Sequence, residues 1–309
     1  MKNRILPLLL ALVLFFGVVP LPTRAAGDVV YVTIADRGEM QIVRYPVTLE
    51  DKNGTGAYEI DDALMLAHNE ETDQLGGYKS YSDADKTEGI WITQLWSRWH
   101  NGYVGFTVNG VKAYSAADPV KAGDEIYAWN YYTTDWDELK DIEACFDKAT
   151  DPVVIDIKPG KSVTLTLGPE KALTNGAQIR IYPMKSNGWK LDKRYSPDIA
   201  EMDADGKFTY TFEEAGVYCI LAEHTSEAFL GLVPAYRYVF VRDFVCGDVN
   251  GDGAVNMQDA TMLSRYLADW DVEPNLDAAD TDVSGAVNMQ DVTLLRRYLA
   301  GWDVTLGQA

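Results

Sequence analysis

Apolar and polar residues alternate in short runs through the first part of the chain. Residues 29–34 and 42–49 follow this two-residue period and are rich in β-branched and aromatic side chains, which is typical of strands. Similar runs lie at 91–95, 103–108 and 125–129. Residues 60–68 instead place apolar side chains every three to four positions, which predicts a helix. The polar residues 69–90 predict a long loop, so this region is expected to be a β-rich α+β domain.

Three motifs in the same region mark turn and core positions. They are residues 60–66, 103–110 and 120–126, and the second ends in the hairpin signal Asn109-Gly110. With these motifs, residues 28–132 resemble the β-grasp-like C-terminal domain of transcobalamin, which is widespread in exported bacterial proteins. The resemblance implies a β-grasp-like domain over residues 27–142 and transfers no binding residues, because the shared positions are structural.

A second series of alternating runs begins after residue 150. The runs lie at 153–157, 162–167, 177–182, 208–212, 217–221 and 236–241. Strands this short, separated by turns such as the Pro-Gly at 159–160, predict an antiparallel β-sandwich over residues 150–243. The segment resembles bacterial immunoglobulin-like domains, and Tyr218 resembles the tyrosine found at a strand corner of such folds.

The first 26 residues have the pattern of a secretory signal peptide. Lys2 and Arg4 precede an apolar run from Ile5 to Val19, and the small residues Ala25 and Ala26 follow. No later apolar stretch approaches the length of a membrane span. We therefore expect a secreted, extracellular protein with no membrane span once the leader is removed.

Charge and cysteine content restrict the classes of partner. The chain has 27 basic and 47 acidic residues, giving a formal net charge of −20, which disfavours nucleic acid and anionic membranes. Such a surface suits cations, neutral polymers or a basic partner. Cys145, Cys219 and Cys246 have no CxxC spacing, so zinc binding is not indicated. Two alternatives remain for these cysteines: one disulfide, or buried free thiols.

The last part of the chain contains a duplicated segment. Residues 254–272 align without a gap to residues 286–304, with four mismatches: Ala260/Val292, Met262/Leu294, Ser264/Arg296 and Asp269/Gly301. Each copy joins a loop with oxygen-bearing side chains at positions 1, 3, 5, 9 and 12 to an amphipathic helix. This is the spacing of an EF-hand-like calcium loop, with Gly253 and Gly285 at the turn. The copies are expected to pack together as a small all-α unit.

Calcium requires several oxygen ligands, and each loop supplies six candidate residues, the one at position 7 through its backbone carbonyl. The predicted ligands of two calcium ions are Asp248, Asn250, Asp252, Ala254, Asn256 and Asp259 in the first loop, and Asp280, Asp282, Ser284, Ala286, Asn288 and Asp291 in the second. Asn256 and Asn288 occupy a position where ligation often passes through water. Calcium removal is expected to unfold the unit.

Two departures from an ordinary EF-hand narrow this interpretation. Position 12 is Asp rather than Glu, and the residues before Asp248 read as strand and turn rather than helix. With these features and the duplication, residues 246–309 resemble a type I dockerin. The resemblance implies docking onto a cohesin domain of a scaffoldin, as in cellulosomes, and attachment to the cell surface through that scaffoldin. It also implies a role in polysaccharide catabolism.

In dockerins, loop positions 10 and 11 and helix positions 17 and 18 commonly contact cohesin. By this resemblance the cohesin-binding residues are Met257, Gln258, Ser264 and Arg265 in the first copy, and Met289, Gln290, Arg296 and Arg297 in the second. The near identity of the copies predicts that cohesin can be bound in either of two orientations.

The role of residues 27–245 stays open between alternatives. Aromatic residues concentrated between 91 and 136 could form a carbohydrate-binding face or could simply be core, so a polysaccharide is a second candidate partner. No recognisable catalytic motif accompanies the histidines at 68, 100 and 224. We expect binding or spacer modules without an active site. The alternatives are a polysaccharide-active hydrolase carried by the dockerin, or a cell-surface adhesion component.

Overall fold

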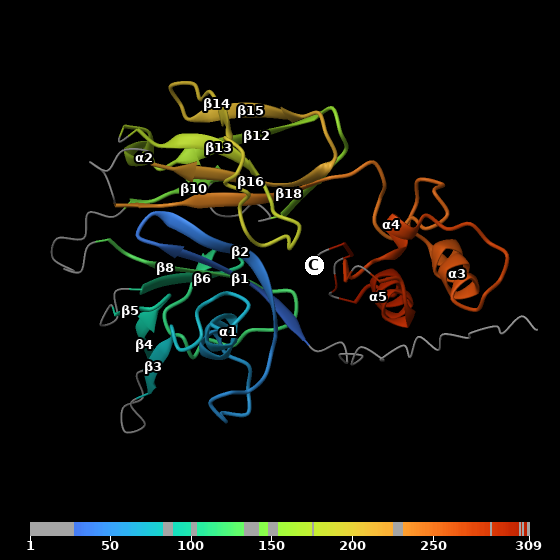
Figure 1. The fold of residues 1–309 in the computed structure, drawn as a ribbon, viewed down its shortest axis with the longest axis horizontal. Coiled ribbons are helices and arrows are strands. Elements are labelled where there is room, and N and C mark those ends of the chain that lie inside the picture. Colours follow the sequence, from blue (N-terminus) through green and yellow to red (C-terminus); the bar gives the residue numbers. More distant parts are fainter. Residues whose placement is uncertain are drawn as a thin grey trace, which may run out of the picture.

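The computed structural model describes residues 28–82, 89–99, 104–132, 142–147, 154–174, 176–224, 231–284, 286–302, 304 and 306–307. The predicted leader, residues 1–26, and Gly285 lie outside these described residues. The described chain is β-rich, with several sheets, few helices and a separate helical region at the C-terminus (Figure 1). Among the described helices, none combines the length and apolar character needed to cross a bilayer.

The first sheet is mixed and has the strand order β2-β1-β8-β6-β7. Its elements, with the helix that follows β2, are β1 (Val29–Asp36), β2 (Glu39–Thr48), α1 (Ile60–Ala67), β6 (Val104–Val108), β7 (Val111–Lys112) and β8 (Glu125–Asn130). Strand β1 runs antiparallel to β2 and parallel to β8. Helix α1 begins after Glu59, whose side chain forms a reciprocal capping box with Asp62. It lies over one face of the sheet (Figure 1).

A small second sheet extends this region, in the order β3-β4-β5. Its strands are β3 (Lys79–Ser82), β4 (Ile90–Leu95) and β5 (Arg98–Trp99). The prediction of an uninterrupted loop over residues 69–90 is therefore wrong, because β3 lies within it. Strand β3 escaped detection since its four residues include three polar ones and it carries no alternating apolar face.

Two further sheets, together called the sandwich after the fold predicted for this region, have the orders β10-β12-β15 and β11-β18-β16-β13-β14. Their strands are β10 (Cys145–Phe146), β11 (Val154–Ile157), β12 (Lys161–Gly168), β13 (Gln178–Pro183), β14 (Asp198–Ala200), β15 (Lys207–Phe212), β16 (Gly216–Glu223) and β18 (Ala235–Val241). Helix α2 (Glu170–Thr174) and the short pair β9 (Ile142–Glu143) and β17 (Leu232–Val233) accompany them. The strands of these two sheets run antiparallel to their neighbours, except that β11 runs parallel to β18. The accompanying strands β9 and β17 are also parallel to each other.

The first sheet and the sandwich share a buried layer that the alternating patterns did not predict. Every residue of β18 is buried, as are six of the eight residues of β1. One face of each strand belongs to its own core, and the other packs across the boundary. Thr33 Oγ1 donates to Tyr236 Oη at 2.9 Å, and Tyr127 Oη donates to the Pro234 carbonyl at 2.8 Å. Because polar side chains of the boundary find partners there, the two regions form one packed body.

Arg44 strengthens this boundary with a buried charge. Its Nε donates to Glu125 Oε1 at 2.8 Å, and its guanidinium lies over the rings of Tyr31 and Tyr238, at 4.1 and 5.0 Å from their centroids. Burial raises the pKa of Glu125, and the charge of Arg44 opposes that rise. The pair therefore connects β2 and β8 to β18 of the sandwich.

The C-terminal region is a compact helical unit. It consists of α3 (Met257–Tyr266), α4 (Leu276–Ala279) and α5 (Met289–Leu299) around a small apolar core. The fully or nearly buried members of that core are Val249, Ala260, Leu263, Ala279, Val292 and Leu295. The described stretch 231–256 contains strands and turns but no helix, as the sequence predicted for the residues before Asp248.

The chain connecting the sandwich to this unit is held by several contacts. Arg242 Nε donates to both oxygens of Asp156, at 3.1 and 2.9 Å, and its guanidinium lies over Phe240 and Phe244. A Cβ placed on Gly307 would lie 2.6 Å from Arg242 Nη2, so the C-terminal tail packs closely against the same side chain. These contacts favour a stiff junction.

The cysteines are free thiols. Cys219 and Cys246 are buried and Cys145 is partly exposed. Burial raises the pKa of Cys246 to about 12 and also raises that of Cys219. The structure therefore favours the buried-thiol alternative over a disulfide.

Candidate functional site

Helices α3 and α5 each start directly after position 9 of the preceding loop, where an asparagine caps the helix. Asn256 Oδ1 accepts a hydrogen bond from the Gln258 amide at 2.8 Å, and Asn288 Oδ1 accepts one from Gln290 at 2.7 Å. Asparagine is a favoured residue at this capping position because it satisfies an otherwise unpaired amide. The Nδ2 groups of the same two residues donate to the position 7 carbonyls of their loops, at 3.1 and 2.9 Å.

The carboxylate at position 12 ties each loop to its helix. Asp259 and Asp291 are fully buried, and each accepts the amide of its capping asparagine at 2.8 Å. Their second oxygens accept the position 3 amides, from Asn250 at 3.0 Å and from Asp282 at 3.2 Å. These bonds orient both carboxylates toward the loops, which explains why the third residue of each helix is acidic.

The first loop turns around Asp248. Its carboxylate accepts the amides of Asp252 and Gly253, at 3.1 and 2.9 Å. Gly253 has a φ of +91°, a conformation that favours glycine because it has no Cβ. Asn250 Nδ2 donates to Asp252 Oδ2 at 2.9 Å.

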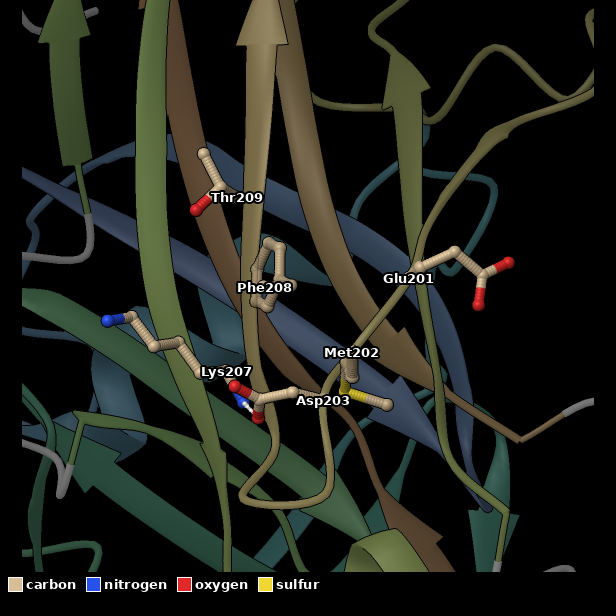
Figure 2. Close-up of a pocket in the computed structure, with 6 residues that line it drawn as sticks. All are labelled: Glu201, Met202, Asp203, Lys207, Phe208 and Thr209. Atoms are coloured by element: carbon tan, nitrogen blue, oxygen red, sulfur yellow. Dashed lines mark hydrogen bonds between the residues drawn. The ribbon is translucent and has the colours of Figure 1, made fainter.

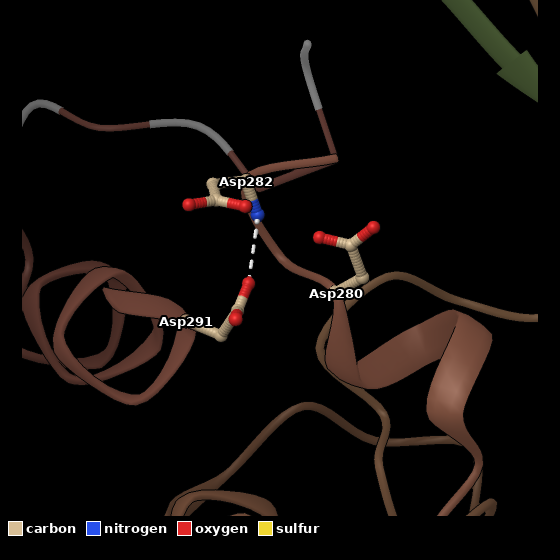
Figure 3. A group of neighbouring side chains, drawn as sticks. All are labelled: Asp280, Asp282 and Asp291. Atoms are coloured by element: carbon tan, nitrogen blue, oxygen red, sulfur yellow. Dashed lines mark hydrogen bonds between the residues drawn. The ribbon is translucent and has the colours of Figure 1, made fainter. Parts of the chain in front are cut away.

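The second loop gathers three carboxylates. Oxygens of Asp280, Asp282 and Asp291 all lie within 4.8 Å of one another, and Figure 3 shows their side chains converging from the loop and from the start of α5. Burial raises the pKa of Asp291, and the charges of Asp282 and Asp280 raise it further. Like charges this close repel each other unless a cation lies between them, so the donor set fits a divalent ion that prefers oxygen.

The residues predicted to contact a partner lie on the surface of α3 and α5. Met257 and Met289 are 58% and 59% exposed, although large apolar side chains are more often buried. Gln258, Arg265, Arg296 and Arg297 are exposed, while Ser264 and Gln290 are partly exposed. Arg296 Nη2 donates to Ser264 Oγ at 3.1 Å, so the two position 17 residues meet where the helices cross.

Two tryptophans on this surface were not predicted to have a role. Trp270 and Trp302 follow α3 and α5 and are as exposed as the methionines. Arg265 lies over the ring of Trp270 at 5.2 Å, and Arg297 lies over that of Trp302 at 5.3 Å. Both tryptophans fall within the repeated segment. Their identity at equivalent positions outside the apolar helix pattern is the signal that could have identified them.

The aromatic residues upstream do not form one surface. Trp129 and Tyr131 are buried in the layer between the first sheet and the sandwich. Trp96 packs against His68, with ring centroids 5.4 Å apart. Trp91 and Trp99 remain exposed, whereas Tyr103 and Trp136 lie outside the described residues. The core interpretation therefore holds for part of the cluster.

His68 has a structural environment. Its Nδ1 lies 2.6 Å from the Leu64 carbonyl, and its Nε2 accepts the Trp96 amide at 3.0 Å. Burial lowers its pKa to about 4, so the ring is neutral at physiological pH. With one nitrogen donating and the other accepting, the ring joins α1 to the segment after β4.

One surface pocket of about 470 Å³ lies on the sandwich, lined by Glu201, Met202, Asp203, Lys207, Phe208 and Thr209. Figure 2 shows the Glu201 side chain pointing away from Asp203. Asp203 Oδ1 accepts the amides of Asp205 and Lys207, at 3.0 and 2.9 Å, and so stabilises a turn. The pocket does not present the paired carboxylates that glycoside hydrolysis requires.

Comparison with known proteins agrees with the geometry of the C-terminal unit. Residues 246–300 match the family model of the type I dockerin domain. No curated protein matches the chain. Type I dockerins bind calcium and dock onto cohesins in cellulosome-type assemblies, and proteins that carry them are typically extracellular and attached to a scaffoldin. The C-terminal region of this chain is therefore a type I dockerin domain.

Proposed function

We propose that this protein is a secreted, non-catalytic subunit that docks onto a cohesin of a scaffoldin in a polysaccharide-degrading assembly. The observation that carries the proposal is the near-equivalence of the two loop and helix copies. Each copy has a buried position 12 carboxylate and an exposed methionine beside it. A single such loop could be an acidic surface turn, but two with matching surfaces indicate a module for recognition.

Calcium would be held by the twelve loop residues predicted from the sequence, one ion in each loop. The ion supplies positive charge that offsets the crowded carboxylates, and it thereby stabilises the folded loops. Asp259 and Asp291 orient the helices through their amide hydrogen bonds, while Asn256 and Asn288 cap them. In this arrangement calcium sets the fold of the module, and the exposed side chains set the partner.

Cohesin would be bound through one copy at a time. Met257 and Gln258 with Arg265 form one set, and Met289 and Gln290 with Arg297 form the other. We add Trp270 and Trp302 to these sets, because each stacks with the arginine of its own copy. Exposed methionine and arginine-stacked tryptophan are both favourable at protein interfaces. Two equivalent sets support binding in two orientations.

The upstream body would serve as a binding and spacing module composed of a β-grasp-like domain and an immunoglobulin-like domain. The order β2-β1-β8-β6-β7, with β1 parallel to β8, supports the first assignment. Two facing sheets and the bond from Tyr218 Oη to the Glu214 carbonyl at 3.3 Å support the second.

Titration of the secreted chain with a panel of type I cohesins, in calcium and in chelator, tests the proposal. Binding in calcium alone is expected. Replacement of Met257 and Gln258 by alanine should leave binding nearly intact, as should the matched replacement of Met289 and Gln290. Replacement of all four should abolish it. If either pair alone abolishes binding, docking in two orientations is wrong, and if no cohesin binds the unaltered chain, the proposed function is wrong.

A further inference from the structure

The small sheet β3-β4-β5 presents three aromatic side chains to solvent. Tyr81, Trp91 and Trp99, one from each strand, are 58%, 51% and 60% exposed. Large aromatic side chains gain about 2 kcal/mol when they are buried, so three of them exposed on one small sheet are unusual. The sheet lies at the edge of the molecule, away from the sandwich and the dockerin domain (Figure 1).

The strand register places these side chains on one face. Tyr81 lies directly opposite Trp91, and residues in register on neighbouring strands share a face. Gln94 lies opposite both Lys79 on β3 and Trp99 on β5. Lys79 and Tyr81 are two residues apart on one strand, which puts both of these groups on the same side.

An irregularity in β4 makes this arrangement possible. Trp91 and Gln94 are three residues apart and would point to opposite faces of a regular strand. The register shifts between Lys79 and Ser80, so β4 contains one more residue than β3 over this interval. A bulge of this kind redirects the side chains that follow it. Its consequence is confirmed by Lys79, whose Nζ lies 4.7 Å from the centroid of the Trp99 ring.

The opposite face of the sheet already has a partner. Ile92 and Leu95 are buried in the core beneath α1. Arg98, opposite Leu95, donates to both oxygens of Asp36 on the first sheet. The aromatic residues are therefore not needed to attach the sheet to the body, and the stability of the fold does not account for them.

A buried polar group without a hydrogen-bond partner lies beneath this face. Gln94 is 7% exposed, and its Oε1 has no hydrogen-bond partner among the described residues. A buried acceptor left unpaired costs about 1–3 kcal/mol. A ligand hydroxyl would satisfy it if the Lys79 side chain moved away from the Trp99 ring, since the acceptor is covered in the structure.

The geometry points to this face, formed by Lys79, Tyr81, Trp91, Gln94 and Trp99, as a binding site for a neutral polysaccharide. Sugar rings present C–H groups on their faces, which aromatic rings attract through their negatively charged π surfaces. Their hydroxyls suit the Gln94 acceptor and the Lys79 donor. The choice of a polysaccharide rests in part on the proposed function, and the net charge of −20 favours a neutral chain over an acidic one.

A protein partner would use the face less well. Protein interfaces usually surround aromatic anchors with a closely packed apolar core. Here the aliphatic residues Ile92 and Leu95 point inward, and Lys79 and Gln94 lie between the Tyr81–Trp91 pair and Trp99. Three rings spread over a three-stranded sheet, with polar groups between them, fit an extended chain of sugars better.

Native gel electrophoresis of the full chain through gels containing soluble neutral glycans tests this inference, with glucans, xylan and mannan as probes and polygalacturonate as the acidic comparison. We expect at least one neutral glycan to retard the protein. The double variant Trp91→Ala, Trp99→Ala should weaken that retardation by about tenfold or more. The matched control is Tyr195→Ala, which removes an aromatic side chain that is 63% exposed and lies between β13 and β14 of the sandwich; it should change nothing.

Cohesin binding and circular dichroism are measured on the same samples. A variant that loses glycan binding while keeping its spectrum and its cohesin affinity supports the site. If none of the neutral glycans retards the unaltered chain, or if polygalacturonate retards it most, the inference is wrong. The inference is also wrong if the double variant binds glycan as well as the unaltered chain does. In that case the glycan binds elsewhere, and the aromatic face suits a protein partner instead. Retained cohesin binding in any of these cases leaves the proposed docking function intact.

Discussion

The upstream body and the dockerin domain are stabilised in different ways. In the body, β1 and β18 are buried on both faces, and three apolar clusters follow one another through the sheets. The dockerin domain has one small cluster and places fully buried carboxylates beside it. The body can fold on the apolar surface it buries, whereas we expect the dockerin domain to need an ion that balances its charges.

Removal of calcium should give the largest difference in stability between the two regions. A chelator is expected to abolish the helical signal of α3 and α5 and leave the β signal of the body unchanged. At free calcium about 1,000 times the dissociation constant, binding contributes roughly 4 kcal/mol to folding. Circular dichroism melts with and without chelator provide the measurement. A single transition that ignores chelator would contradict the difference between the two regions.

A substitution in the shared layer should affect the body alone. Trp129 is 3% exposed, and Gly105 leaves it room, since a Cβ there would lie 2.2 Å from the ring. Trp129→Ala is expected to cost about 3–5 kcal/mol of the body's free energy of unfolding, because the cavity opens between two sheets. Chemical denaturation gives the value. The matched control, Trp302→Ala, removes an exposed ring from the dockerin domain and should leave the body's transition in place.

Lowering the pH should destabilise the upstream body through the protonation of His68, and this sharpens the comparison with the dockerin domain. Its folded pKa of about 4 lies below the unfolded value of about 6.5, so the unfolded chain takes up a proton first as the pH falls. The stability that neutral His68 provides is complete above pH 6.5 and is lost progressively toward pH 4, by roughly 3 kcal/mol. Denaturation midpoints between pH 7 and 4.5 measure the loss. His68→Gln should flatten the pH slope, and an unchanged slope would exclude this role.

In the dockerin domain, Asp291 makes stability depend on pH in the opposite direction. Its pKa is raised in the folded state, so without a cation, protonation at low pH favours the folded loop rather than opposing it.

The duplicated loops could be predicted closely because their chemistry follows from sequence spacing. Oxygen-bearing residues at fixed positions and a capping asparagine are local features, and the structure shows the same asparagine cap and the same buried position 12 carboxylate in both copies. Among the described residues, the carboxylates come close together in the second loop. The strands β1 and β18 were also predicted, within one or two residues at their ends. In both cases the signal lies within about a dozen consecutive residues.

Features that depend on distant residues were not predictable in this way. The pairing of Thr33 with Tyr236 crosses 203 positions, and no local period distinguishes a solvent-facing side chain from one facing another sheet. Strand β3 was missed because its inward side chain is Ser80 rather than an apolar residue. The exposed face beside it depends on a register shift in β4, which only the assembled sheet shows. Trp91 could therefore be recognised as aromatic but not placed.

The contacts of Arg242 have a consequence for how the whole molecule would sit in an assembly. Its bonds to Asp156 hold its guanidinium against the end of the sandwich, and the tail of the dockerin domain packs against the same group at Gly307. These contacts favour a fixed angle between the two regions. With a hinge at this point, a change of cohesin-binding orientation would reorient only the dockerin domain. With a fixed angle, a change of cohesin-binding orientation would carry the entire body with it. Two docking orientations would then direct Trp91 and Trp99 to opposite sides of a scaffold, so one gene product could reach substrate in two directions.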